Sequence, residues 1–148
     1  MPTVQKSLRM QDTLAQAITD AAVATGRDFT AIATELLSEA IAMRQCPGIA
    51  FMDGATGRRA ILAGTGVDVW EVVYVYEHAD RNFDELRQAF SRLTEPQLRA
   101  ALSYAVLYPE EIRRRIVAND AWTPERLDRH PSMAVQPVRR DRQSASSP

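Results

Sequence analysis

The stretch from Asp28 to Cys46 constrains the fold most strongly, because its apolar residues recur with the period of an α-helix. Asp28 can cap this helix at its start, and the turn-forming run Cys46-Pro47-Gly48 ends it. The apolar positions form one stripe: Phe29, Ile32, Ala33, Leu36, Leu37, Ala40 and Ile41. A helix with such a stripe needs another element to cover it.

A second amphipathic helix is predicted just before this one. Asp12 can cap it, and the apolar residues that follow have helical spacing: Leu14, Ile18, Ala21 and Ala22. Gly26 ends the helix as a left-handed residue at its C-terminus.

The chain opens with "MPTVQKSLRM", which we interpret as a β-strand. Val4, Lys6, Leu8 and Met10 then share one face, and Gln5, Ser7 and Arg9 share the other. The strand has no partner within residues 1–46, and this piece is too small to build a core alone. We therefore expect a homodimer in which two such strands pair antiparallel. A two-stranded ribbon fits the major groove of DNA.

The segments "VQKSLRM" and "TGRDFTAIATELLSEAI" resemble the ribbon-helix-helix family of repressors. The resemblance implies that Gln5, Ser7 and Arg9 read base edges. It also implies that the start of the second helix, at Asp28, Phe29 and Thr30, lies on phosphate, as helix N-termini tend to do.

Lys6 departs from this family pattern, because the position is usually apolar. Either its stem extends over the core, or the inward face begins only at Leu8. We count Lys6 among the DNA-binding candidates, since it can also reach a phosphate. The alternative for the whole segment is a dimerisation arm that touches no nucleic acid.

Residues 47–118 have a different organisation. The strand candidates "IAFM" and "RRAIL" flank the turn residues "DGATG" and predict a β-hairpin. Three capping boxes predict three short helices, at Asp68–Glu71, Asn82–Glu85 and Thr94–Gln97, and the helix resumes after Pro109. The residues expected to face inward are Val69, Val73, Tyr76, Leu86, Ala89, Phe90, Leu98, Ala101, Leu102, Ala105 and Val106.

This half resembles the domain of unknown function 433, which is often grouped with VapB-type antitoxins. The residues that carry the resemblance are "RRAILAGTGVDVWEVV", "LT" and "RAALSYAVLYPEE", and it covers about residues 48–112. It implies a small hairpin followed by a homeodomain-like three-helix bundle. The usual Gly-Thr-Arg is replaced here by Gly64-Thr65-Gly66, so any contact made by that Arg is lost or moved. We thus expect a mainly α fold: a dimeric ribbon-helix-helix segment, then the hairpin and the bundle.

The remaining stretch, residues 119–148, is rich in Pro, Arg and Ser. A short helix is predicted around Trp122 and Leu127, and disorder after His130. This segment is interpreted as a solvated terminus, with an interaction tail as the alternative.

Several classes of function are disfavoured. His78, His130 and Cys46 cannot form a plausible zinc site, and "GTG" at 64–66 lacks the spacing of a nucleotide-binding loop. We predict no cofactor, no metal and no enzyme activity. No apolar run approaches the ~18 residues of a membrane span, no signal-peptide pattern opens the chain, and one cysteine allows no internal disulfide. These features predict a cytoplasmic protein.

The combined interpretation is a dimeric transcriptional regulator of antitoxin type, which binds operator DNA through the ribbon and docks a toxin through its second half. The DUF433 resemblance implies a PIN-like ribonuclease as that toxin. The candidate partner-binding residues are Trp70, Tyr74, Arg99 and Tyr104. The alternatives are a stand-alone transcription factor with both halves on DNA and, third, a structural dimer without nucleic acid.

Overall fold

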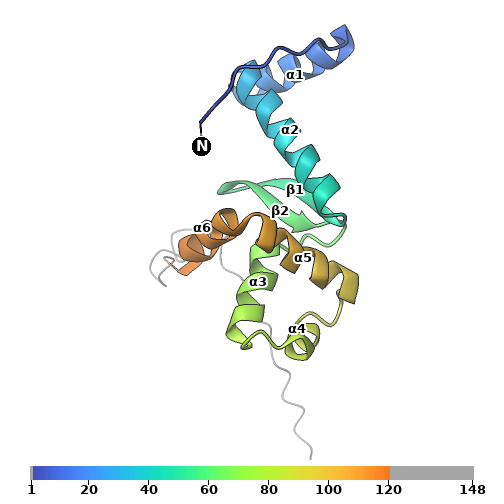
Figure 1. Ribbon diagram of the computed structural model, residues 1–148, viewed down its shortest axis with the longest axis vertical. Helices are drawn as coiled ribbons and strands as arrows, with labels where there is room; N and C mark the ends of the chain where they lie inside the picture. The colour runs from blue at the N-terminus through green and yellow to red at the C-terminus, as the bar shows by residue number, and fades with distance from the viewer. Residues whose placement is uncertain (1, 121–148) are drawn as a thin grey trace, which may run out of the picture.

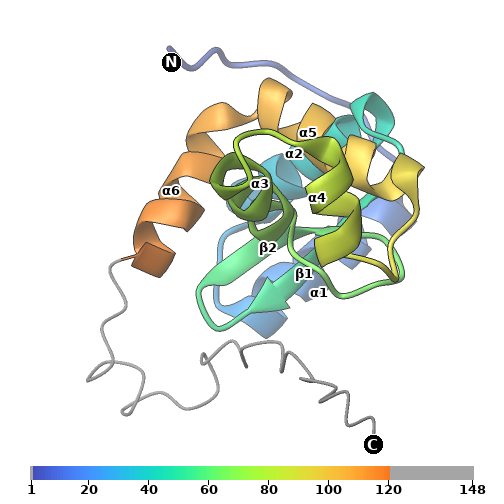
Figure 2. The ribbon, with the colours of Figure 1, turned by 90° about the horizontal axis from the view of Figure 1, so that it is seen from below.

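The computed structural model describes residues 2–120 and is mainly helical, with six α-helices and one two-stranded antiparallel hairpin. Helices α1 (Asp12–Thr25) and α2 (Phe29–Gln45) form an arm that projects from the rest of the molecule (Figure 1). The hairpin and helices α3 to α6 gather at the end of α2 that is distant from α1 (Figure 1), and they lie in front of the arm when the molecule is seen from below (Figure 2). The features predicted around Trp122, Leu127 and His130 lie outside the described residues.

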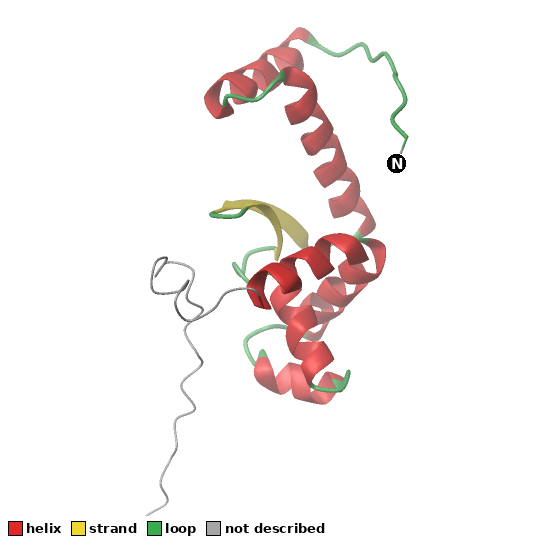
Figure 3. Ribbon diagram, turned by 90° about the vertical axis from the view of Figure 1, so that its left-hand side faces the viewer, coloured by secondary structure: helices red, strands yellow, loops and turns green. Residues whose placement is uncertain are grey.

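Residues 2–11 form neither a helix nor a strand in the single chain, and they lead away from the arm as an irregular segment (Figure 3). A strand needs a partner for its backbone hydrogen bonds. The strand predicted over residues 1–10 requires pairing with a second chain, so the single chain does not test it and it stays a prediction.

The ends of the arm helices follow from local sequence. Gly26 ends α1 in the left-handed region with φ 66°, as predicted. The Asp28 carboxylate accepts a hydrogen bond from the Ala31 amide at 2.7 Å, which confirms the predicted cap of α2. The prediction for Asp12 was wrong, because Gln11 occupies the N-cap and Asp12 is the first helical residue. Its charge still favours the helix from that position, through the helix dipole.

Helix α2 contributes to two separate cores. Its first half buries Ile32 against Ile18 and Ala22 of α1. Its end buries Ala42, with Cys46 just beyond, in the larger core of the hairpin and bundle. Most of the predicted apolar stripe is left uncovered in the single chain, and Leu36, Leu37 and Ile41 are each about half exposed or more.

The hairpin consists of β1 (Ile49–Gly54) and β2 (Gly57–Leu62), paired in register from Ile49–Leu62 to Gly54–Gly57. This confirms the predicted strands and turn. The following turn is held by Thr65, whose hydroxyl donates to the Leu62 carbonyl at 2.8 Å and accepts from the Val67 amide at 3.0 Å. The "GTG" run is thus a structural turn.

The bundle contains α3 (Val69–His78), α4 (Phe83–Ala89), α5 (Glu95–Leu107) and α6 (Pro109–Asp120). Thr94 and Gln97 form the complete capping box that we predicted, and Asn82 caps α4 through the Asp84 and Glu85 amides. Asp68 stands at the N-cap of α3 without a side-chain cap bond, so that part of the prediction was wrong. Its carboxylate accepts instead from Arg59 and Trp70.

The core of the bundle is built where α3 packs against α5 and α6. The fully buried side chains with the largest volumes are Tyr104, Leu62, Leu86, Leu98, Val69 and Val72. Two predicted inward residues are instead exposed, Ala89 and Val106. On α5 the buried face runs through Leu98, Ala101 and Tyr104, which turns Val106 to solvent.

No helix within residues 2–120 combines the length and the apolar character that crossing a membrane requires.

Candidate nucleic-acid interface

The predicted base-reading side chains lie together on the segment that precedes α1. Gln5, Lys6, Ser7 and Arg9 are all exposed in the single chain. Met10 anchors the end of this segment by packing against the small core of Ile18, Ala22 and Ile32. The segment therefore exposes its hydrogen-bonding groups to solvent, while its C-terminal end is held in place at Met10.

Val4 and Leu8, which alternate with these polar residues, have no core to enter in the single chain. Val4 is 77% exposed and Leu8 is 68% exposed. An alternating strand needs a surface that covers its apolar face. Within residues 2–120 no element covers Val4 or Leu8, whereas Met10 at the end of the same face packs on the small core.

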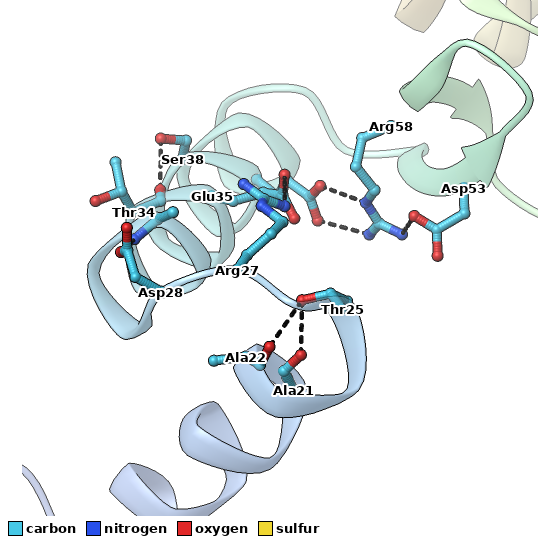
Figure 4. A network of polar contacts seen from close by, with 12 residues as sticks. Ala21, Ala22, Thr25, Arg27, Asp28, Thr34, Glu35, Ser38, Asp53 and Arg58 are labelled. Carbon is cyan, nitrogen blue, oxygen red and sulfur yellow. Dashed lines mark hydrogen bonds and ion pairs between the residues drawn. The ribbon is translucent and has the colours of Figure 1, made fainter.

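The start of α2 lies next to a cation that the sequence analysis did not select. Arg27 forms an ion pair with Glu35 at 2.9 Å across the first turns of α2, beside the Asp28 cap (Figure 4). Phe29 and Thr30 follow in the exposed first turn. The Asp28 carboxylate already occupies the helix N-terminus, and its negative charge opposes a phosphate there. Arg27, which is half-exposed, is the better phosphate candidate at this end.

The four residues proposed for a protein partner do not form one surface. Tyr104 is buried, donates its hydroxyl to Glu111 at 2.6 Å and stacks beside Tyr108, so its side chain is not available to a partner. Arg99 lies on the exposed face of α5, paired with Glu95 and placed over the Phe83 ring. Tyr74 packs against His78 at the end of α3.

Trp70 belongs to a polar cluster at the start of α3. Its indole N–H donates to the Asp68 carboxylate at 3.1 Å, and Arg59 of β2 binds the same oxygen at 2.8 Å. These two donors take the carboxylate that was predicted to cap α3. Burial, followed by repulsion from Asp68, raises the pKa of Glu71 above its ordinary value. Gly66, where the resemblance leads us to expect an arginine, has a φ of +70°, a conformation that an arginine would rarely adopt.

A small pocket of about 190 Å³ lies between α3, α5 and α6. Its lining is mostly apolar, with Glu77 and Arg113 as the charged members. No group of three or more His, Cys, Asp or Glu side chains in the described part of the chain is arranged to hold a metal ion.

The sequence analysis missed the most buried charged pair between the arm and the hairpin. Glu39 of α2 is 9% exposed and receives two hydrogen bonds from Arg58 of β2, at 2.7 and 2.8 Å. The sequence indicates the burial of Glu39 only through helical spacing. Glu39 falls on the same face of the helix as the buried residues Ile32, Ala42 and Cys46.

Comparison with known proteins identifies one part of the chain. Residues 49–105 match the family model described as protein of unknown function DUF433. The match spans the hairpin, α3, α4 and most of α5, and it bears out the second resemblance over this range. No curated protein and no solved structure matches the chain. The resemblance of residues 1–46 to ribbon-helix-helix repressors stays a prediction.

Proposed function

We propose that this protein is a dimeric, DNA-binding transcriptional regulator of antitoxin type. The observation that carries the proposal is the uncovered apolar face of the N-terminal arm, together with the polar segment that precedes α1. Most large apolar side chains exposed within residues 2–120 belong to this arm and its leading segment. They are Val4, Leu8, Leu14, Val23, Phe29, Leu36, Leu37, Ile41 and Met43.

The arm has little core of its own. Only Ile18, Ala22 and Ile32 are buried between α1 and α2. A concentration of exposed large apolar side chains on one arm favours an interaction site there. A second copy is the natural occupant, because it covers the stripe of α2 and supplies the missing strand partner for residues 3–10. Such a dimer has no stable folded monomeric arm.

Pairing of two leading segments would produce an antiparallel ribbon with Gln5, Ser7 and Arg9 on its outer face. Arg can bind guanine with two hydrogen bonds, and Gln can bind adenine in the same way. Lys6 would contribute phosphate affinity without sequence preference. This chemistry suits double-stranded operator DNA.

The test is selection of a binding sequence from a random duplex library, followed by titration of variants. Arg9→Ala should lower specific affinity by ~1–3 kcal/mol and relax the preference for the selected sequence. Arg113→Ala is the matched control, since it removes an equal charge from the exposed surface of α6 and should leave binding unchanged. Equal behaviour of the two variants, or no selected sequence at all, would refute the DNA-binding role.

We propose the second half as the docking module for a toxin, a PIN-like ribonuclease if the family resemblance extends to the partner. The support is the match to DUF433 and the apolar pocket between α3, α5 and α6. Co-purification from the native host should yield a nuclease bound to the chain.

A stand-alone transcription factor is the competing proposal. It needs the exposed face of α5 to contact DNA, and Arg99 is the cation on that face. In that case Arg99→Ala should weaken binding to the selected duplex, and no nuclease should co-purify.

A further inference from the structure

The Glu39–Arg58 ion pair joins two parts of the molecule that otherwise meet through few polar contacts. Arg58 Nε and Nη2 donate to the two carboxylate oxygens of Glu39 in a bidentate arrangement. Gln45, at the end of α2, makes the other polar link by accepting from the Tyr108 hydroxyl at 2.6 Å. Glu39 lies in the second half of α2, between Ile32 in the small core with α1 and Ala42 in the larger core of the hairpin and bundle. This contact and the burial of Ala42 and Cys46 in the larger core together hold α2 against the hairpin.

Arg58 has a second acid within reach. Its Nη1 donates to Asp53 at 3.2 Å, and Asp53 is the cross-strand neighbour of Arg58 in the hairpin. The Asp53 side chain is 89% exposed, whereas that of Glu39 is 11% exposed. If Arg58 leaves Glu39, its charge stays paired with Asp53, and Glu39 can turn to water as α2 moves off the hairpin. In the structure Arg58 thus bridges both acids at once, and loss of the contact with Glu39 would leave its charge paired with Asp53 alone.

The backbone of Arg58 is held from the opposite side by α6. Arg115 donates to the Arg58 carbonyl and to the Thr56 hydroxyl, the latter at 2.7 Å. Thr56 lies in the hairpin turn, so Arg115 fixes both the turn and the first residues of β2. Displacement of α6 would release the hairpin tip, and with it the position from which Arg58 reaches Glu39.

We propose that Arg115, Arg58 and Glu39 form a relay that couples the position of α6 to the orientation of the N-terminal arm. With α6 seated, Arg58 binds Glu39 and the arm has one orientation. With α6 displaced, Arg58 loses Glu39, keeps only Asp53 as its partner, and the arm is released. The relay rests on the proposed function only for its consequence: a protein docked on the bundle at α6 would alter the geometry of the DNA-binding ribbon.

The direct test is the distance between spin labels on the arm and on the bundle of the full-length protein. Labels at Thr13→Cys and Gln88→Cys, both exposed positions, report this distance in a Cys46→Ala background. Dilution with unlabelled chain limits each dimer to one labelled copy. The parent protein should give one narrow distance distribution.

Glu39→Gln keeps the shape of the side chain and removes its charge, so a second distance population should appear. Arg115→Gln should produce the same second population, although Arg115 does not touch the arm. Each variant has a matched control on the same helix. Glu35→Gln removes an acid whose partner, Arg27, is within the arm, and Arg113→Gln removes an exposed cation paired with Glu110. Both controls should keep the narrow distribution.

If Glu39→Gln leaves the distribution unchanged, the ion pair does not orient the arm. If Glu39→Gln adds the population and Arg115→Gln does not, the coupling to α6 is refuted. Arg58→Lys keeps the charge and loses the bidentate geometry, so it should shift the populations even where Glu39→Gln proves too unstable to label. The spin-label distances are measured in the absence of DNA. Failure of the parent protein to bind DNA would therefore refute the proposed function while leaving the relay to be judged by the distances.

Discussion

Tyr104 is a buried residue whose ring packs against two aromatic side chains and whose hydroxyl is hydrogen-bonded. Its ring contacts Phe51 edge-on and stacks beside Tyr108, and its hydroxyl binds Glu111 of α6. Burial, together with this hydrogen bond, raises the pKa of Tyr104 well above its ordinary value. The side chain thus stays protonated in the folded protein where the unfolded chain would ionise.

Tyr104→Phe should lower the free energy of unfolding by about 1–3 kcal/mol at neutral pH, because the Glu111 carboxylate loses its donor. The raised pKa adds a pH dependence. Above about pH 10 the unfolded chain releases the Tyr104 proton and the folded chain does not, so stability falls as pH rises. Urea titrations from about pH 8 to about pH 11 should show a shallower decline for the Phe variant. Parallel declines would contradict this account.

Arg81 is held in an unfavourable backbone conformation. It has a φ of 58° in the turn between α3 and α4, directly after Asp80 with a φ of 51°. A side chain in the left-handed region costs roughly 1–2 kcal/mol, and glycine avoids most of this cost.

Arg81→Gly should therefore raise the free energy of unfolding by about 1 kcal/mol, since the exposed side chain gives up no packing. Arg87→Gly is the control, because the same change inside α4 should lower stability by about 1 kcal/mol. Thermal unfolding of the two variants should move in opposite directions. If both variants are less stable than the parent protein, the positive φ of Arg81 does not cost free energy that glycine can recover.

At the scale of elements, the start of α5 depends on a reciprocal pair of hydrogen bonds. The Thr94 hydroxyl accepts from the Gln97 amide at 3.3 Å, and the Gln97 side chain accepts from the Thr94 amide at 2.8 Å. Thr94→Ala should cost about 1 kcal/mol, while Thr94→Asn should cost much less because Asn also caps helices. Melting temperatures of the two variants provide the measurement. An equal loss in both would mean that the cap bond does not stabilise α5.

At the scale of the whole molecule, the arm should associate into a dimer through its exposed apolar face. Leu37→Lys places a charge on the uncovered stripe of α2 and should shift the sedimentation coefficient of the full-length chain from dimer to monomer. Val106→Lys is the control, since Val106 is even more exposed but lies on the bundle. A folded wild-type monomer at micromolar concentration would refute the dimer and, with it, the ribbon.

Features that depend on neighbouring residues were predictable from the sequence. The Asp28 cap, the left-handed Gly26, the strands and turn of the hairpin and the Thr94–Gln97 box each form between residues that are close along the chain. Their energies are local, so the pattern suffices to predict them. The exposure of Gln5 and Arg9 also follows from their polarity. What they bind stays a prediction, because the ribbon needs a second chain.

Features that depend on distant elements were decided only by the tertiary structure. Asp68 has the sequence of a cap, but Arg59 and Trp70 bind its carboxylate. Tyr104 replaces Val106 in the core because α6 supplies Glu111 as a partner for its hydroxyl. Glu39 lies buried because Arg58, on the hairpin, reaches it with two hydrogen bonds. Burial of a charged or polar group costs free energy unless a hydrogen-bonding or ionic partner is buried with it. The partners of these side chains come mostly from other elements of the fold, so the sequence around each residue does not reveal them.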